Sequence, residues 1–226
     1  MLPGRNESWR RDPRAGVLVI VAGVMLAGFL ALLAAILLAP SFMALDVAVS
    51  EAIWGIDAPG LTRVAVFASD VGDFWPMALL TAATVLILAF TGRRPEALTV
   101  LLAVAVGTAL GNALKYAVDR ARPAIELARI PPLETGSFPS GHAIGSLLFF
   151  GSLAFVVLID EKKLGRSVAI AVTCALAVLA IGLSRVYLGV HYLGDVVGAW
   201  LLGSAWLAFV VLISAYWGAG RANAES

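Results

Sequence analysis

The chain has 226 residues, of which 61% are hydrophobic and 14% are charged, whereas an ordinary soluble domain has roughly 45–50% apolar and about 25% charged residues. This composition excludes a water-soluble globular fold and predicts a chain surrounded mainly by lipid. The formal net charge of +1 supplies no broad positive field, so nucleic-acid binding is excluded as well.

The first apolar run extends from Gly16 to about Leu38, which is long enough for a helix to cross a bilayer. A cleaved signal peptide is the alternative because four arginines stand among the first 14 residues, but its apolar core would have only about 7–15 residues. Further runs cover residues 74–90, 97–118, 142–159, 167–183 and 193–217. The predicted fold is therefore all-α, a six-transmembrane helical bundle.

The stretch between the first and second runs has a different character. From Pro40 to Asp73 apolar residues such as Leu45 and Val49 alternate with Asp46 and Glu51. This mixture predicts an interfacial, amphipathic helical segment in the headgroup layer, with a plain surface loop as the alternative.

Lysines and arginines collect on the cytoplasmic side of membrane proteins. Here they fall in the N-terminal segment, at 93–94, at 162–166 and at Arg221, all on one side of a six-span arrangement. We therefore expect one membrane domain over residues 16–217 between cytoplasmic segments 1–15 and 218–226. Both termini would be cytoplasmic, and the remaining connections extracytoplasmic.

Three polar clusters adjoin span ends on the extracytoplasmic side. The first places Lys115 near the end of the third span and Arg122 seven residues later, before Pro123. Because proline disfavours helical geometry at the preceding residue, we expect the chain to leave the helix at Arg122. The alternative is that both cations snorkel toward headgroups for solubility.

The second cluster, Pro139-Ser140-Gly141-His142, opens the fourth span. Free backbone N–H groups and the helix dipole favour an anion there, and Gly141 permits its close approach. Ser140 adds a hydroxyl donor, although an ordinary N-cap serine is the alternative. His142 can give or take a proton near neutral pH.

The third cluster supplies Arg185 at the end of the fifth span, and His191 and Asp195 four residues apart at the start of the sixth. One helical turn would let the Asp195 carboxylate hold one ring nitrogen of His191 and leave the other free. A structural hydrogen bond that closes the helix end is the alternative. Together the clusters offer a nucleophile, a proton donor and three cations, which are the parts that phosphoryl transfer needs.

These three clusters resemble the signature of the type-2 phosphatidic acid phosphatases, a family similar in fold to vanadium haloperoxidases and bacterial acid phosphatases. The matching residues are Lys115-x6-Arg122-Pro123, Pro139-Ser140-Gly141-His142 and Ser184-Arg185-x5-His191-x3-Asp195.

The resemblance implies that His191 attacks phosphorus, that Asp195 orients it and that His142 protonates the leaving group. It also implies a phosphate site formed by Lys115, Arg122, Ser140, Gly141 and Arg185, with no metal and no cofactor. Asp119, Arg120 and Glu134 lie near the site but outside the signature. For Asp119 we expect an ion pair with Lys115, four residues earlier.

The expected function is a lipid phosphate or diphosphate phosphatase of a bacterial inner membrane, acting on the extracytoplasmic side through a phosphohistidine. Undecaprenyl diphosphate, phosphatidylglycerophosphate and phosphatidic acid are the candidate substrates, the first slightly favoured. The alternatives are a lipid phosphotransferase and a non-catalytic lipid-binding or transport protein. The oligomeric state is left open.

Overall fold

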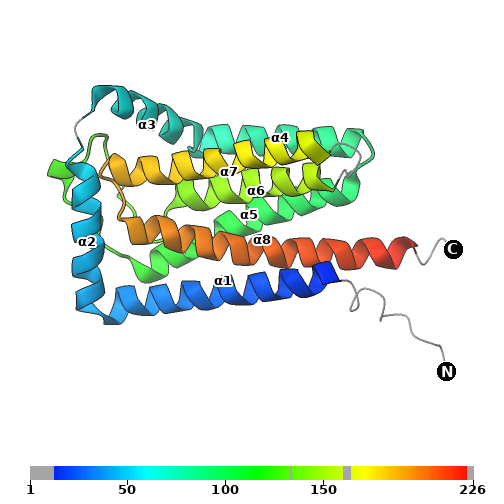
Figure 1. Ribbon diagram of the computed structural model, residues 1–226, viewed down its shortest axis with the longest axis horizontal. Coiled ribbons are helices and arrows are strands. Elements are labelled where there is room, and N and C mark those ends of the chain that lie inside the picture. Colours follow the sequence, from blue (N-terminus) through cyan, green and yellow to red (C-terminus); the bar gives the residue numbers. More distant parts are fainter. Residues whose placement is uncertain (1–12, 57, 133, 160–163, 223–226) are drawn as a thin grey trace.

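We describe the protein from a computed structural model that covers residues 13–56, 58–132, 134–159 and 164–222. Every regular element in these ranges is a helix (Figure 1). The helices are α1 (Pro13–Leu38), α2 (Pro40–Trp54), α3 (Pro59–Val71), α4 (Phe74–Phe90), α5 (Arg94–Val118), the short η2 (Ile125–Leu127), α6 (Gly141–Leu158), α7 (Leu164–Tyr187) and α8 (Leu193–Ala222). The predicted all-α class is confirmed. Predictions for the basic residues at 5–11 and 162–163 lie outside the described residues.

Five of the described helices, α1, α5, α6, α7 and α8, are each long and apolar enough to cross a membrane. The predicted second span coincides with α4, which has only 17 residues. Helix α4 is long enough to cross a membrane only together with α3, which is bent by 53° against it. The chain is thus a multi-pass integral membrane protein with five such helices among the described residues, or six if the bent pair of α3 and α4 counts as one span.

The segment between α1 and α4 forms two helices, α2 and α3, so the plain surface loop alternative is wrong. Pro40 and Pro59 stand in the first turns of α2 and α3, where a proline costs no hydrogen bond. Helix α2 runs across the end of the bundle (Figure 1). It turns Asp46, Ser50 and Trp54 inward, because residues four apart share one helix face.

Helix α6 lies at the centre of the bundle and packs against α5, α7 and α8, while α1 packs against α8. Ile144 and Leu148 of α6 belong to the main hydrophobic core, together with Phe138 just before it. A Cβ atom at Gly198 of α8 would lie 2.3 Å from the Phe138 ring, so glycine is required there. This packing fixes where α6 and α8 begin relative to each other.

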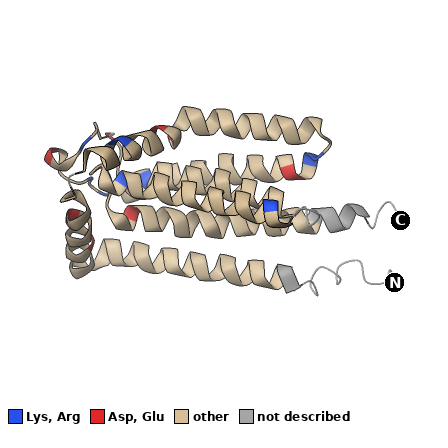
Figure 2. Ribbon diagram, turned by 45° about the horizontal axis from the view of Figure 1, so that its top comes forward, with Lys and Arg blue, Asp and Glu red and all other residues tan. Residues whose placement is uncertain are grey.

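The two ends of the bundle differ in their polar residues. Helix α1 begins and α8 ends at one end, and α2 covers the other (Figure 1). Charged residues gather at the α2 end, with a second group at the turn between α4 and α5 (Figure 2). All three predicted clusters lie at the α2 end, where α5 and α7 finish and α6 and α8 begin.

Candidate active site

His191 and Asp195 meet at the start of α8. The Nδ1 atom of His191 lies 3.2 Å from Oδ2 of Asp195, and both side chains are buried. His191 itself precedes the helix, which begins at Leu193. The predicted contact is present, but the two residues do not share a helix face. Asp195 reaches back over the helix N-terminus, where its Oδ2 also accepts the Tyr192 N–H at 3.0 Å.

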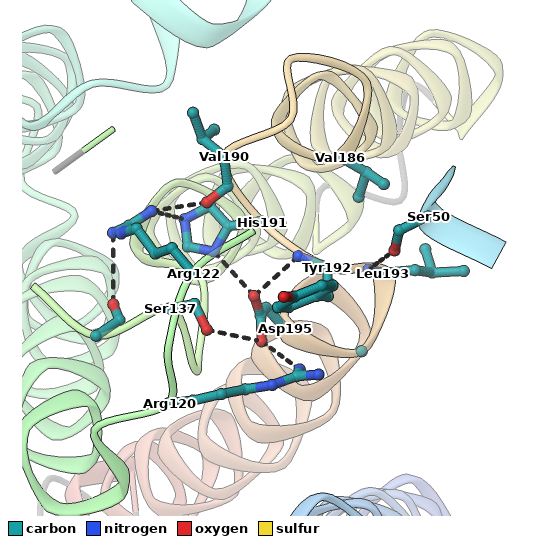
Figure 3. Close-up of polar contacts among 12 residues, drawn as sticks. Ser50, Arg120, Arg122, Ser137, Val186, Val190, His191, Tyr192, Leu193 and Asp195 are labelled. Carbon is teal, nitrogen blue, oxygen red and sulfur yellow. Dashed lines mark hydrogen bonds and ion pairs between the residues drawn. The ribbon is translucent and has the colours of Figure 1, made fainter. Parts of the chain in front are cut away.

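The surroundings of the His191 ring define its tautomer (Figure 3). Its Nε2 atom lies 3.2 Å from Nη1 of Arg122, and a guanidinium can only donate. Nε2 is therefore the acceptor, and the ring proton lies on Nδ1 and is donated to Asp195. Burial lowers the pKa of His191 to about 4, against the opposing effect of Asp195. At neutral pH the imidazole is uncharged, and its lone pair on Nε2 accepts from Arg122.

Arg122 is fixed by backbone carbonyl groups on both sides. Its Nε donates to the Thr135 carbonyl at 2.8 Å, and its Nη1 donates to the Val190 carbonyl at 2.8 Å. The latter bond ties the α5–α6 connection to the residue before His191. Arg122 is thus held as a cation next to Nε2, and no carboxylate in the described part of the chain pairs with it.

Lys115 lies in the last turn of α5 and is buried. Its Nζ donates to the Gly136 carbonyl at 3.0 Å. The snorkelling alternative is wrong for this residue, because the ammonium group turns into the protein. The predicted ion pair with Asp119 is also wrong, since no such pair joins these two described residues.

Helix α5 ends at Val118, where the predicted apolar run ends. The expectation that the chain leaves the helix only at Arg122 is wrong, because Asp119 adopts a left-handed conformation with φ of 44°. Aspartate tolerates this region better than most residues. Its N–H caps the helix by donating to the Lys115 carbonyl at 3.1 Å.

Ser140 occupies the N-cap position of α6, but its side chain makes no capping hydrogen bond. Its Oγ is buried without a hydrogen-bond partner, so the ordinary N-cap alternative is wrong. A Cβ atom at Gly141 would meet nothing within 4 Å. A donor hydroxyl and an open backbone surface therefore adjoin the first turn of α6, the arrangement that an anion requires.

His142 faces a carboxylate that the sequence prediction missed. Its Nε2 lies 2.9 Å from Oδ1 of Asp73, the residue before α4. The contact lacks hydrogen-bond alignment, since Nε2 has no hydrogen-bond partner. Asp73 is largely exposed, with 58% of its side chain accessible. His142 is thus close to an acceptor and still free to bond elsewhere.

Arg185 is buried in the last turn of α7. Its Nη1 donates to Oγ of Ser69 on α3, and its Nε has no partner. Asp73 and Ser69 together show that the broken helix of α3 and α4 lies against the second and third clusters. Sequence spacing could not reveal this contact, because the segments are more than 60 residues apart.

All eight predicted site residues lie at this end of the bundle, around the starts of α6 and α8. Glu134 is exposed and makes no contact that links it to the others. Arg120 and Asp46, in contrast, are buried and bonded to each other, and Arg120 also bonds to Asp195. The sequence indicated the pair of Arg120 and Asp46 only weakly, through charged residues that stand among apolar ones.

The fold and this site define a multi-pass membrane protein with a buried histidine–carboxylate pair and an anion site at one end. The model of the PAP2 superfamily matches residues 96–219. The chain therefore belongs to the PAP2 superfamily, as its signature indicated. It is an integral-membrane lipid phosphatase of the PAP2 type.

Two curated relatives support this assignment. Phosphatidylglycerophosphatase B of Bacillus subtilis is 29% identical over 77% of this chain and 86% of its own length. Undecaprenyl-diphosphatase of Sulfolobus acidocaldarius is 30% identical over 66% of this chain and 68% of its own length.

Two solved structures share the fold. The PAP2-type phosphatidylglycerolphosphate phosphatase of Bacillus subtilis has a TM-score of 0.73 at 25% identity and covers 84% of this chain and 94% of its own. LpxE of Aquifex aeolicus has a TM-score of 0.58 at 24% identity and covers 74% of this chain and 94% of its own. The second likeness concerns the fold alone.

Proposed function

We propose that this phosphatase acts through a phosphohistidine at His191, on the extracytoplasmic face of the membrane. The observation that carries the proposal is the fixed tautomer of His191. Asp195 holds Nδ1–H, and the neutral ring presents its Nε2 lone pair beside Arg122. An oriented, uncharged imidazole next to a cation is suited to attack an anionic phosphate.

Unsatisfied donors among the predicted phosphate-binding residues support this proposal. Oγ of Ser140 and Nε of Arg185 are buried without partners, and a Cβ atom at Gly141, in the first turn of α6, would meet nothing within 4 Å. Bound phosphate oxygens would satisfy these groups. Lys115 and Arg122 complete the predicted phosphate site by supplying two further positive charges.

The reaction has two balanced steps. Nε2 of His191 bonds to phosphorus while the bond to the leaving oxygen breaks, and a proton from His142 passes to that oxygen. Water then attacks the phosphohistidine, gives a proton to His142 and releases phosphate and free His191. The order of roles follows from microscopic reversibility.

The substrate is proposed from the relatives and from the chemistry of the site. The named relatives act on phosphatidylglycerophosphate and undecaprenyl diphosphate, and phosphatidic acid presents the same terminal phosphate group. The slight preference for undecaprenyl diphosphate stays a prediction. The deciding experiment measures phosphate release from these three lipids by purified protein, beside the His191→Ala variant.

The same assay separates the alternatives. Labelled phosphate that appears mainly in an acceptor lipid, instead of free in solution, would show a phosphotransferase. Lipid binding with no turnover on any of the three substrates would favour the non-catalytic alternative.

The extracytoplasmic location is proposed from the distribution of cations. Arg93, Arg94 and Arg166 lie at the end of the bundle opposite the site, as the positive-inside rule requires of a cytoplasmic end. At the site end Lys115, Arg120 and Arg185 are buried, Arg122 and Arg129 are partly buried, and Arg63 is exposed. All of them except Arg63 bond to groups of the protein, so we do not count those five as topology signals. Labelling single cysteines from outside intact cells would test this orientation.

Vanadate is expected to inhibit the enzyme. It takes the five-coordinate geometry of a phosphoryl-transfer transition state, and a site complementary to that state binds such mimics more tightly than substrate. Titration at fixed lipid should give inhibition that competes with substrate and is weakened in Arg122→Ala. Full activity at saturating vanadate would contradict the proposed site.

Chelation is expected to leave the activity intact. The charges that stabilise the phosphate come from Lys115, Arg122 and Arg185, so the mechanism has no step that needs a divalent ion. Phosphate release should be equal with and without EDTA. A loss that Mg²⁺ or Zn²⁺ restores would overturn the metal-free mechanism.

A further inference from the structure

The two carboxylate oxygens of Asp195 have different partners. Oδ2 accepts Nδ1–H of His191 and the N–H of Tyr192. Oδ1 accepts Nη1 of Arg120 at 2.6 Å, with Oγ of Ser137 more distant at 3.5 Å (Figure 3). The carboxylate is therefore held from both sides, and Arg120 fixes the orientation of its plane.

Arg120 is held in turn by Asp46 of α2. Its Nη2 donates to Oδ2 of Asp46 at 2.8 Å, and the two side chains are 5% and 4% exposed. The guanidinium also lies over the Tyr192 ring, 4.4 Å from its centroid. Burying such a pair costs desolvation energy that its attraction offsets only in part. Stability alone is a weak reason for its presence beside the nucleophile.

Helix α2 contacts the start of α8 at two points. Oδ1 of Asp46 accepts the Gly194 N–H at 2.8 Å. A Cβ atom at Gly194 would lie 2.5 Å from Oδ2 of Asp46, so glycine lets the carboxylate approach. One turn later, Oγ of Ser50 accepts the Leu193 N–H at 3.2 Å. Both contacts anchor α2, but only Asp46 belongs to the chain of charges that leads to His191.

We propose that Asp46 and Arg120 are positioning residues for the reaction at His191. Asp46 fixes the Arg120 guanidinium, which locks the Asp195 carboxylate with Oδ2 on Nδ1 of His191. Helix α2 thus helps to orient the His191 ring through Asp46. This inference rests on the proposed phosphohistidine mechanism.

The charges in this chain also affect the basicity of the nucleophile. Burial lowers the pKa of His191, Asp195 raises it, and Arg122 and Arg185 lower it. Asp46 acts on the ring through the position of Asp195. If the Asp195 carboxylate is displaced, it raises the pKa of His191 less, so removal of the Asp46 charge should lower this pKa.

The first test is Asp46→Asn. We expect kcat to fall roughly ten- to hundredfold, as slight misplacement of a reacting group does, while KM stays within about twofold because Asp46 does not bind phosphate. The acid limb of kcat/KM should move to lower pH, because a displaced Asp195 raises the pKa of His191 less than a fixed one. Ionisation of the lipid phosphate affects all variants equally, so a difference in the acid limb between variants reports on the enzyme. An unmoved acid limb with unchanged kcat would overturn the proposal.

The second test asks whether Asp46 acts through Arg120. We expect Arg120→Gln to reduce kcat strongly, and Asp46→Asn to cause no further loss in that background. Residues coupled in one network show such non-additivity. Losses that multiply in the double variant would show that Asp46 acts independently and would refute the proposed chain.

Ser50→Ala is the matched control, because it removes the neighbouring α2–α8 contact without changing any charge. Its kcat and the acid limb of its kcat/KM profile should match those of the unchanged protein. Equal losses in Ser50→Ala and Asp46→Asn would show that Asp46 and Arg120 have only a structural role.

If Asp46→Asn does not fold, Gly194→Ala is the alternative variant, because its Cβ atom displaces the Asp46 carboxylate while all charges remain. It should lower kcat with KM retained. Inactivity of the unchanged protein on every lipid would refute the proposed function itself, which is a different result from any of these.

Discussion

Replacement of His191 by alanine is expected to reduce phosphate release by at least about 10³-fold, since removal of a covalent nucleophile leaves only binding and electrostatic effects. The loss should fall on kcat. KM should change little, because the groups proposed to bind phosphate remain. Steady-state assays in detergent micelles, with the thermal stability of each variant recorded, would measure both quantities.

The structure provides a control for this experiment. Asp195→Asn keeps the shape of the His191 partner but removes its charge, and its amide group can turn a donor toward Nδ1. We expect a large fall in kcat from loss of the correct tautomer, smaller than that of His191→Ala. Normal turnover in His191→Ala would contradict covalent catalysis and favour direct attack by water.

Replacement of His142 by glutamine is expected to have an effect that depends on the leaving group. General acid catalysis contributes about 10²–10⁴-fold, and more when the departing oxygen is a strong base. Phosphatidylglycerophosphate and phosphatidic acid release an alkoxide-like oxygen, whereas undecaprenyl diphosphate releases a weakly basic phosphate oxygen. The loss should therefore be larger for the monoester lipids than for the diphosphate.

A synthetic aryl phosphate sharpens this comparison, because a nitrophenolate departs without a proton. His142→Gln should retain most of the first-step rate on such a substrate, and burst kinetics would separate that step from hydrolysis of the intermediate. Equal losses on aryl and alkyl phosphates would show that His142 is not the proton donor. Asp73→Asn is the companion variant, because Asp73 approaches the same ring nitrogen.

The predictable part of the fold was its apolar pattern. Long apolar runs located the five long apolar helices and α4 because lipid imposes a distinct composition on a helix. The runs 74–90 and 97–118 even end at the same residues as α4 and α5. Hydropathy did not predict that α4 is long enough for a span only together with α3, which is bent by 53° against it. That bend depends on local backbone geometry and not on apolar content.

The predictable part of the site was its signature, whose residues all meet at one end of the bundle. The supporting residues were missed for a physical reason. Asp46 and Asp73 reach the site from segments more than 60 residues away along the chain, and no local spacing encodes such contacts. Arg120 lay inside the first motif, yet spacing could not show that it turns toward Asp195.

The interfacial segment illustrates the same limit. Its mixed composition predicted an amphipathic helix with polar groups toward water. The structure instead turns Asp46 and Ser50 of α2 into the protein and leaves Leu45 exposed. Partners on α8 decide this orientation, because buried polar groups need hydrogen bonds.

The most direct test of the mechanism is to trap the covalent intermediate. Purified protein is mixed with lipid carrying a ³²P-labelled terminal phosphate, quenched in base within milliseconds, and digested. The account predicts a phosphoenzyme that is labile in acid and stable in base, with the label on the peptide that contains His191 and absent from His191→Ala. Label on another residue, or rapid turnover with no labelled protein at any time, would contradict it.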